Sequence, residues 1–196
     1  MDAFEPIRIE AAALHDRLIA TGVDSLDPMA LVQSAITDLD LELVWLSAGD
    51  PALKGARALF DDQSGTICCE RVGEHAARAL LVAHEIGHAR LHAGSATCAS
   101  GDIDVTRSTE SAPVGLQRVE DYGARERREL QANVFARELV LPRPHAKALH
   151  VDQGLGAADI AQRTGLPLPL VRQQLFAALL LPPSVPATEI VTSSRA

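Results

Sequence analysis

The sequence predicts an α+β domain in which a small antiparallel sheet packs on one long apolar helix, with a further helical segment near the C-terminal end. Residues 41–71 contain three short apolar runs of strand length. A long apolar run with helical spacing follows over residues 74–92. The chain has 196 residues, of which 47% are hydrophobic and 22% charged, so it can bury a core of its own.

The first elements each have a local signal. Apolar residues repeat at helical spacing over residues 5–20, which predicts a helix. Asp27 followed by Pro28 is typical of a helix N-cap and first helical position, so a second helix should run to about Leu39. The apolar content and length of residues 41–47 predict a strand.

Two more strands and the long helix complete the central part. Residues 56–62 and 66–71 flank a Gln-Ser-Gly turn, which predicts a β-hairpin. The helix over residues 74–92 is apolar on nearly every side, so we expect it in the core, with Gly94 just beyond its end.

The C-terminal half alternates between polar and helical segments. Residues 94–123 are rich in Ser, Thr, Gly and Asp and have no apolar period, which predicts a long loop. A helix is predicted from residue 124 to just before Pro142. Residues 155–181 then predict two short helices around Gly165.

Composition limits the class of protein. The net charge of -8 and the 3% aromatic content argue against a dedicated nucleic-acid binder. There is no apolar run of the roughly 18 residues that a membrane span needs, and the first residues carry acids where a signal peptide carries bases. We therefore expect a cytoplasmic protein with no membrane partner, in which Cys68, Cys69 and Cys98 are reduced.

The long helix contains the pattern H-E-x-x-H at His84, Glu85 and His88. Residues four apart lie on one helix face, so both imidazoles can reach the same metal ion. Neutral imidazole nitrogens suit zinc, and Glu85 then lies beside the open coordination position as a general base. The alternative, a charged turn on a solvated helix, requires an exposed face, whereas the surrounding residues are mostly apolar.

A catalytic zinc ion needs a third protein ligand that leaves one position open. His92 lies eight residues after His84, about 12 Å along the helix axis, so we expect it to support a ligand or the helix C-terminus instead. Glu129 is the better candidate, because it shares a helical face with Asn133 and with two alanines that permit close helix approach. Asn133 could steady a ligand. Alternatively, Glu129 belongs only to the charged run around it.

The segment HEIGHARLH, followed about forty residues later by ELQANVFARELVLP, resembles the ImmA/IrrE family of zinc metallopeptidases. These are gluzincin-like enzymes, so the resemblance implies a zincin-like metallopeptidase core. It covers about residues 55–145. It implies that His84, His88 and Glu129 bind zinc and that Glu85 is the catalytic base.

The resemblance also implies a biological setting. Members of the family typically cleave a helix-turn-helix repressor and so switch on a mobile-element, stress or phage-defence operon. CapP-type regulators of defence systems form one branch, in which DNA damage sensed as single-stranded DNA is the implied trigger. The implied partners are therefore a repressor protein as substrate and single-stranded DNA as activator.

We expect three parts: a zinc metallopeptidase domain over residues 1–145, a small helical subdomain over residues 146–181 and a flexible tail or linker over residues 182–196. The chain departs from IrrE-like members, which carry a separate sensor domain after the peptidase. Residues 157–180 imitate a helix-turn-helix, but the basic residues there are few, namely Arg163 and Arg172. A helical lid or packing hairpin is therefore favoured over a DNA reader.

Proteases of this type commonly hold the substrate as an extra strand on a sheet edge. The strand containing Ile67, Cys68 and Cys69 directly precedes the histidine helix, so it is predicted to be that edge. The two cysteines point to opposite faces, so at most one faces the core. We interpret them as small apolar strand residues rather than redox groups.

Two further residues are candidates for roles at the site. Cys98 lies in a loop of small residues ten positions after His88. Its thiolate could take the fourth position on zinc and inhibit the resting enzyme, or it could be an ordinary loop thiol. Tyr122 could stabilise the oxyanion, or it could have only a packing role.

A competing hypothesis is a non-catalytic module that binds a repressor or DNA without cleaving anything. Glu85 argues against it, because a binding module has no use for a buried base beside two histidines. A regulator that binds DNA through residues 157–180 would show tight, salt-sensitive duplex binding, which an acidic chain disfavours.

Overall fold

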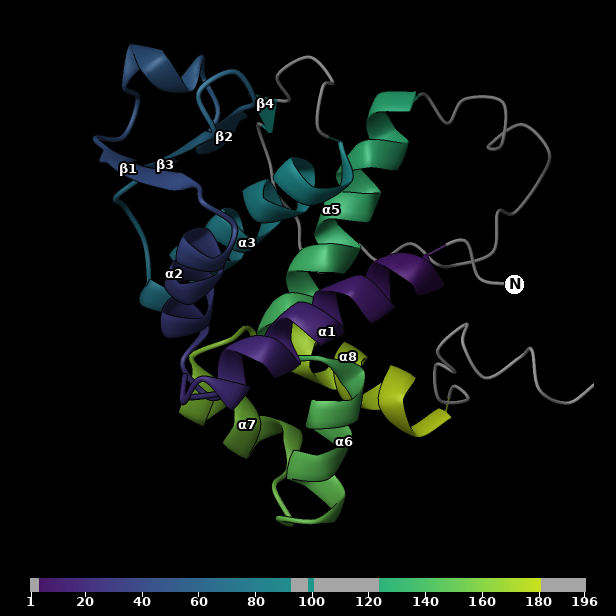
Figure 1. Cartoon of the computed structure of the whole chain (residues 1–196). Helices are drawn as coiled ribbons and strands as arrows, with labels where there is room; N and C mark the ends of the chain where they lie inside the picture. The colour runs from purple at the N-terminus through teal and green to yellow at the C-terminus, as the bar shows by residue number, and fades with distance from the viewer. Residues whose placement is uncertain (1–3, 93–98, 101–123, 181–196) are drawn as a thin grey trace, which may run out of the picture.

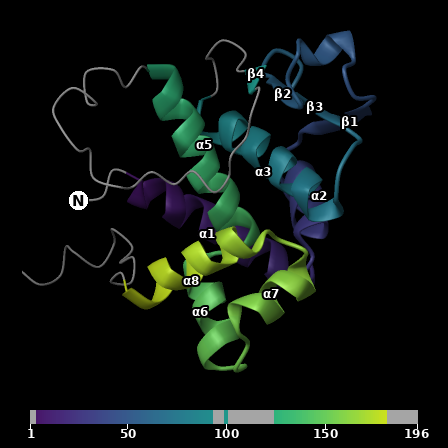
Figure 2. The ribbon, with the colours of Figure 1, turned by 180° about the vertical axis from the view of Figure 1, so that it is seen from behind.

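The computed structural model describes residues 4–92, 99–100 and 124–180 and confirms the α+β class. Its helices are α1 (Glu5–Ala20), α2 (Pro28–Asp38), α3 (His75–Leu91), α5 (Ala124–Val140), α6 (Arg143–Val151), α7 (Ala157–Thr164) and α8 (Leu168–Leu180). Figures 1 and 2 show the sheet at one end of the molecule and α6 to α8 at the opposite end, with α3, α5 and α1 between them. Within the described residues, no helix combines the length and the hydropathy needed to cross a membrane.

Local signals set the helix limits as predicted. The carboxylate of Asp27 accepts hydrogen bonds from the backbone N–H groups of Met29 and Ala30, and Pro28 occupies the first turn of α2. Gly165 ends α7 with a φ of 68°, a conformation that favours glycine. The two predicted helices around Gly165 are therefore confirmed as α7 and α8.

The sheet contains β1 (Glu42–Leu46), β2 (Ala58–Asp61), β3 (Thr66–Glu70) and β4 (Ala99–Ser100), in the order β1-β3-β2-β4. The predicted hairpin is confirmed as β2 and β3. The sheet is mixed rather than antiparallel throughout, because β1 pairs with β3 in parallel. The chain reverses direction between β1 and β2, where η1 (Pro51–Leu53) lies, and again between β2 and β3, so β3 runs in the direction of β1.

The prediction that Ile67, Cys68 and Cys69 form the substrate-binding edge is wrong. Their strand, β3, lies in the interior of the sheet, with β1 on one side and β2 on the other. Its backbone hydrogen-bonding groups are therefore used within the sheet, and no extended peptide can pair with it. Among the described strands, the outer positions belong to β1 and β4.

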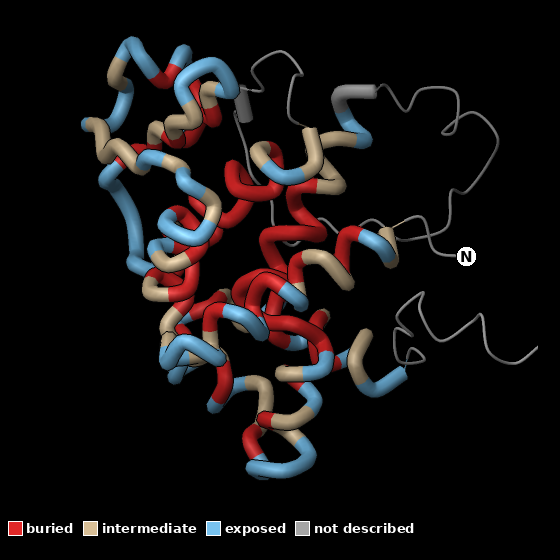
Figure 3. Tube along the Cα trace, viewed as in Figure 1, coloured by how far each residue is buried: buried red, intermediate tan, exposed pale blue. Residues whose placement is uncertain are grey.

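Helix α3 is the centre of the core, as its apolar sequence predicted. It contacts α5, α2, β2 and β3, and its residues from Ala79 to His88 are almost entirely buried (Figure 3). At Gly87 the two central helices come very close, since a Cβ there would lie 3.0 Å from Ala132 Cα and 3.3 Å from Phe135 Cβ. The lack of a side chain at Gly87 therefore sets the distance between α3 and α5.

The C-terminal helices share the same core. Leu149 of α6 and Leu170 of α8 belong to one continuous apolar cluster with the residues of α3 and α5. Helix α6 was not predicted, because the preceding helix was ended before Pro142 and the next helices were placed in residues 155–181; prolines are tolerated at a helix start, and α6 begins just after Pro142. The boundary between residues 145 and 146 stays a prediction. Two residues of the predicted loop over 94–123 form β4.

Candidate metal centre

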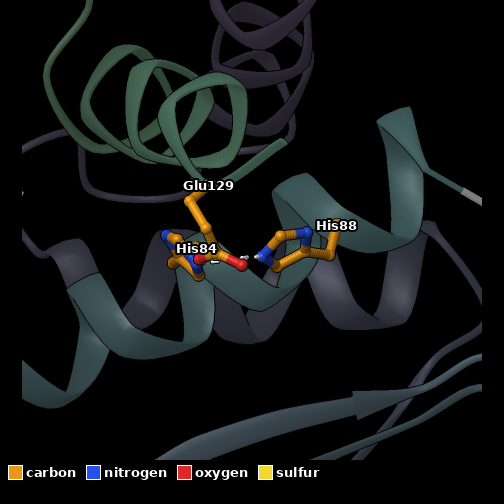
Figure 4. A group of neighbouring side chains, drawn as sticks. All are labelled: His84, His88 and Glu129. Carbon is orange, nitrogen blue, oxygen red and sulfur yellow. Dashed lines mark hydrogen bonds and ion pairs between the residues drawn. The ribbon is translucent and has the colours of Figure 1, made fainter. Parts of the chain in front are cut away.

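Three side chains from two helices converge between α3 and α5 (Figure 4). His84 and His88 project from α3, and Glu129 reaches them from α5. Glu129 Oε2 lies 3.2 Å from His84 Nε2 and 3.7 Å from His88 Nε2. The two Nε2 atoms are 3.0 Å apart. Among the described residues, this group could hold a metal ion, with its ligand atoms all within 4.8 Å of one another.

The far nitrogen of His84 fixes the proton on this ring. Its Nδ1 lies 2.9 Å from Asn133 Oδ1, and both side chains are buried. An amide oxygen can only accept a hydrogen bond, so His84 Nδ1 donates. With a proton on Nδ1, Nε2 is the nitrogen of this ring that is available to bind a metal ion, and it lies on the side of Glu129.

His88 is supported through a second histidine. Its Nδ1 lies 3.0 Å from His92 Nδ1, and His92 Nε2 lies 3.0 Å from Gln131 Oε1. Burial lowers the pKa of His92, which keeps this ring neutral. Because Gln131 Oε1 accepts, His92 carries its proton on Nε2 and accepts from His88 at Nδ1. His88 Nε2 then carries no proton and has a lone pair available for a metal ion.

This arrangement fits zinc. Two imidazole lone pairs and one carboxylate oxygen point at one another with no hydrogen between them, which is favourable only around a cation. Two histidines and one carboxylate are a ligand set that catalytic zinc takes, with a fourth position open. The residues present therefore fit the metal that the sequence pattern predicted.

Glu85 is fully buried next to the first histidine. Its charge also acts on Cys69 in β3, whose pKa is raised to about 12 by burial first and by Glu85 second. The Cys69 thiol is therefore protonated at neutral pH and donates weakly to the carbonyl oxygen of Glu70. Cys69 is buried and Cys68 is half-buried on the opposite face, which supports their interpretation as strand residues.

The structure brings most of the sequence-predicted site residues together. Asn133 and His92 contact the two histidines from behind, in the supporting positions expected of them. Sequence analysis missed Gln131 and Gly87. A glycine inside a buried helix and a polar residue two positions after Glu129 were the available signals. The predictions for Cys98 and Tyr122 lie outside the described residues.

A family comparison agrees with this geometry. Residues 51–176 match the family model of the IrrE N-terminal-like domain, which describes a peptidase family. The match spans α3, α5 and the C-terminal helices up to most of α8. Comparison with curated proteins and with solved structures gave no match.

Proposed function

The chain belongs to the IrrE N-terminal-like peptidase family, and from this premise we propose that it is a zinc-dependent endopeptidase that cleaves a helix-turn-helix repressor. Cleavage would derepress a defence, stress or mobile-element operon. The observation that supports the metal-dependent chemistry is the convergence of His84, His88 and Glu129, in which the carboxylate lies 3.2 and 3.7 Å from the two Nε2 atoms.

The chain's own residues have distinct tasks in this proposal. His84 and His88 would hold the ion through Nε2, and Glu129 would hold it through its carboxylate. Bound zinc supplies a Lewis acid that polarises the scissile carbonyl. Glu85 takes a proton from the attacking water and returns it to the leaving amine nitrogen, so one carboxylate serves both proton transfers. Its complete burial keeps bulk water from competing for those protons.

The choice of substrate rests on the family resemblance, and the C-terminal helices are consistent with a protein partner rather than duplex DNA. Gln174 of α8 donates to the carbonyl oxygen of Leu141, so α8 is anchored to the core. Its exposed side chains include three large apolar ones, Phe176, Leu179 and Leu180, and a single basic one, Arg172. A DNA-reading helix needs several basic side chains to meet phosphates, whereas α8 carries one.

A cleavage assay tests the proposal. The zinc-loaded protein is incubated with the helix-turn-helix repressor encoded beside its gene, with and without single-stranded DNA, and the products are identified by mass spectrometry. We expect cleavage at one site, stimulation by single-stranded DNA, and at least a hundredfold slower cleavage with Glu85→Gln.

The controls separate the competing functions. A chelator should abolish cleavage, and re-addition of zinc should restore it. If the wild type binds the repressor but never cuts it, or if Glu85→Gln cuts at the wild-type rate, the endopeptidase proposal is wrong. The first of those results would favour the non-catalytic binding module.

A further inference from the structure

The two histidines of the metal centre are held in different ways. His84 donates directly to an amide, Asn133, whose oxygen can only accept. His88 instead contacts the ring of His92, and an imidazole can either donate or accept at Nδ1. The support of His88 is therefore correct only when His92 carries its proton on the far nitrogen. Gln131 Oε1, 3.0 Å from His92 Nε2, favours that position of the proton.

We propose that Gln131 is a positioning residue of the metal centre, acting through His92. Its carbonyl oxygen holds the proton of His92 on Nε2, which leaves His92 Nδ1 to accept from His88 Nδ1. The lone pair of His88 Nε2 then faces Glu129 and His84. This inference rests on the metal-dependent function proposed above, because it explains how one of the ligands is kept ready for the ion.

The reverse arrangement shows what Gln131 prevents. If His92 carried its proton on Nδ1, it would donate to His88 Nδ1, and the proton of His88 would move to Nε2. That proton would point into the space between His84 Nε2, 3.0 Å from His88 Nε2, and Glu129 Oε2, 3.7 Å from it, where the metal ion would otherwise bind. Metal binding would then require removal of the proton from His88 Nε2. An acceptor at position 131 selects the arrangement that binds the ion directly.

Two substitutions at position 131 separate hydrogen bonding from packing. Gln131→Glu keeps a hydrogen-bond acceptor at the same distance from the backbone. Gln131→Met keeps the length of the side chain but removes the acceptor. The affinity for zinc is measured by competition with a chromophoric chelator, without any substrate. We expect Gln131→Met to bind zinc about tenfold more weakly than the wild type, and Gln131→Glu to bind it at least as tightly. Circular dichroism checks that all variants are folded.

A second substitution tests whether the effect passes through His92. His92→Asn places an amide oxygen near the position of Nδ1, so it can accept from His88 without help from residue 131. In that background, Gln131→Met should have no further effect on zinc affinity. Imidazole 15N shifts of the metal-free protein should show the His92 proton on Nε2 in the wild type and distributed over both nitrogens in Gln131→Met.

The outcomes distinguish this inference from the function on which it rests. If the wild type binds no zinc, the metal-dependent function is wrong and the inference is overturned with it. If the wild type binds zinc but Gln131→Met binds it equally well, the inference alone is wrong. An equal loss of affinity in the wild-type and His92→Asn backgrounds would also overturn it, because the effect would then be one of packing.

Discussion

Replacing Gly87 with alanine tests how closely α3 and α5 must approach to build the metal centre. The new Cβ would lie 3.0 Å from Ala132 Cα and 3.2 Å from the Ala132 carbonyl oxygen. Both are backbone atoms, so α5 as a whole must move by several tenths of an ångström. Overpacking of this kind costs about 1–3 kcal/mol. The higher helix propensity of alanine offsets about 1 kcal/mol, so the free energy of unfolding should fall by about 1 kcal/mol.

The same displacement should weaken zinc binding. His88 follows Gly87 on α3, whereas Glu129 lies on α5, so any separation of the helices lengthens the ligand set. Zinc sites tolerate deviations of about 0.2 Å, and we expect the affinity for zinc to fall about tenfold. Urea unfolding of the metal-free protein and chelator competition measure the two effects.

A matched control separates packing from helix propensity. Ala13 is exposed on α1, so Ala13→Gly measures the cost of glycine in a helix of this protein without any clash. It should lower stability by about 1 kcal/mol and leave zinc affinity unchanged. The reasoning is refuted if Gly87→Ala stabilises the protein by the amount that Ala13→Gly costs and binds zinc like the wild type.

Three further predictions concern individual residues. Asn133→Leu removes the acceptor of His84 Nδ1 and should weaken zinc binding about tenfold or more in the chelator assay, whereas Asn133→Asp should not; equal affinities would contradict this support role. Glu85→Gln should retain zinc but lower kcat on the repressor by about 10²–10⁴, and loss of the metal itself would show a structural role instead. Burial lowers the pKa of His15 and of His145, whose rings lie 5.2 Å apart, so the unfolded chain takes up protons more readily than the folded one. The free energy of unfolding, measured with urea, should therefore be highest above about pH 6.5 and should decline as the pH falls below that value, less steeply in His145→Gln. Parallel curves for the two proteins would count against this explanation.

Much of the fold follows from local sequence signals. The cap formed by Asp27, the turn before β3 and the apolar run of α3 each determine structure within a few residues, and each was predicted within a residue or two. The parallel pairing of β1 with β3 was not predicted, because it depends on which side of the hairpin an earlier strand takes. Strand composition carries little information about neighbours. The predicted substrate edge failed for this reason.

The candidate site divides in the same way. The spacing of His84 and His88 is a property of one helix, so it could be read directly from the sequence. Glu129 required a second helix in the correct register, and its two alanines gave only a partial indication of that. The complementary half of the contact, Gly87, was overlooked. Gln131 was missed because it contacts His92 rather than a metal-ligand candidate, and its residue type alone indicates no role.

The central claim is that His84, His88 and Glu129 together bind one zinc ion. X-ray absorption at the zinc edge, recorded on wild-type protein loaded to equilibrium and dialysed, tests it most directly. We predict one zinc per chain, with two imidazole ligands and carboxylate oxygen at about 2.0–2.2 Å; an added sulfur at about 2.3 Å would indicate a cysteine ligand, the role that Cys98 has in one of its two interpretations. A spectrum without imidazole scattering, or a protein that retains far less than one zinc per chain, would contradict the claim.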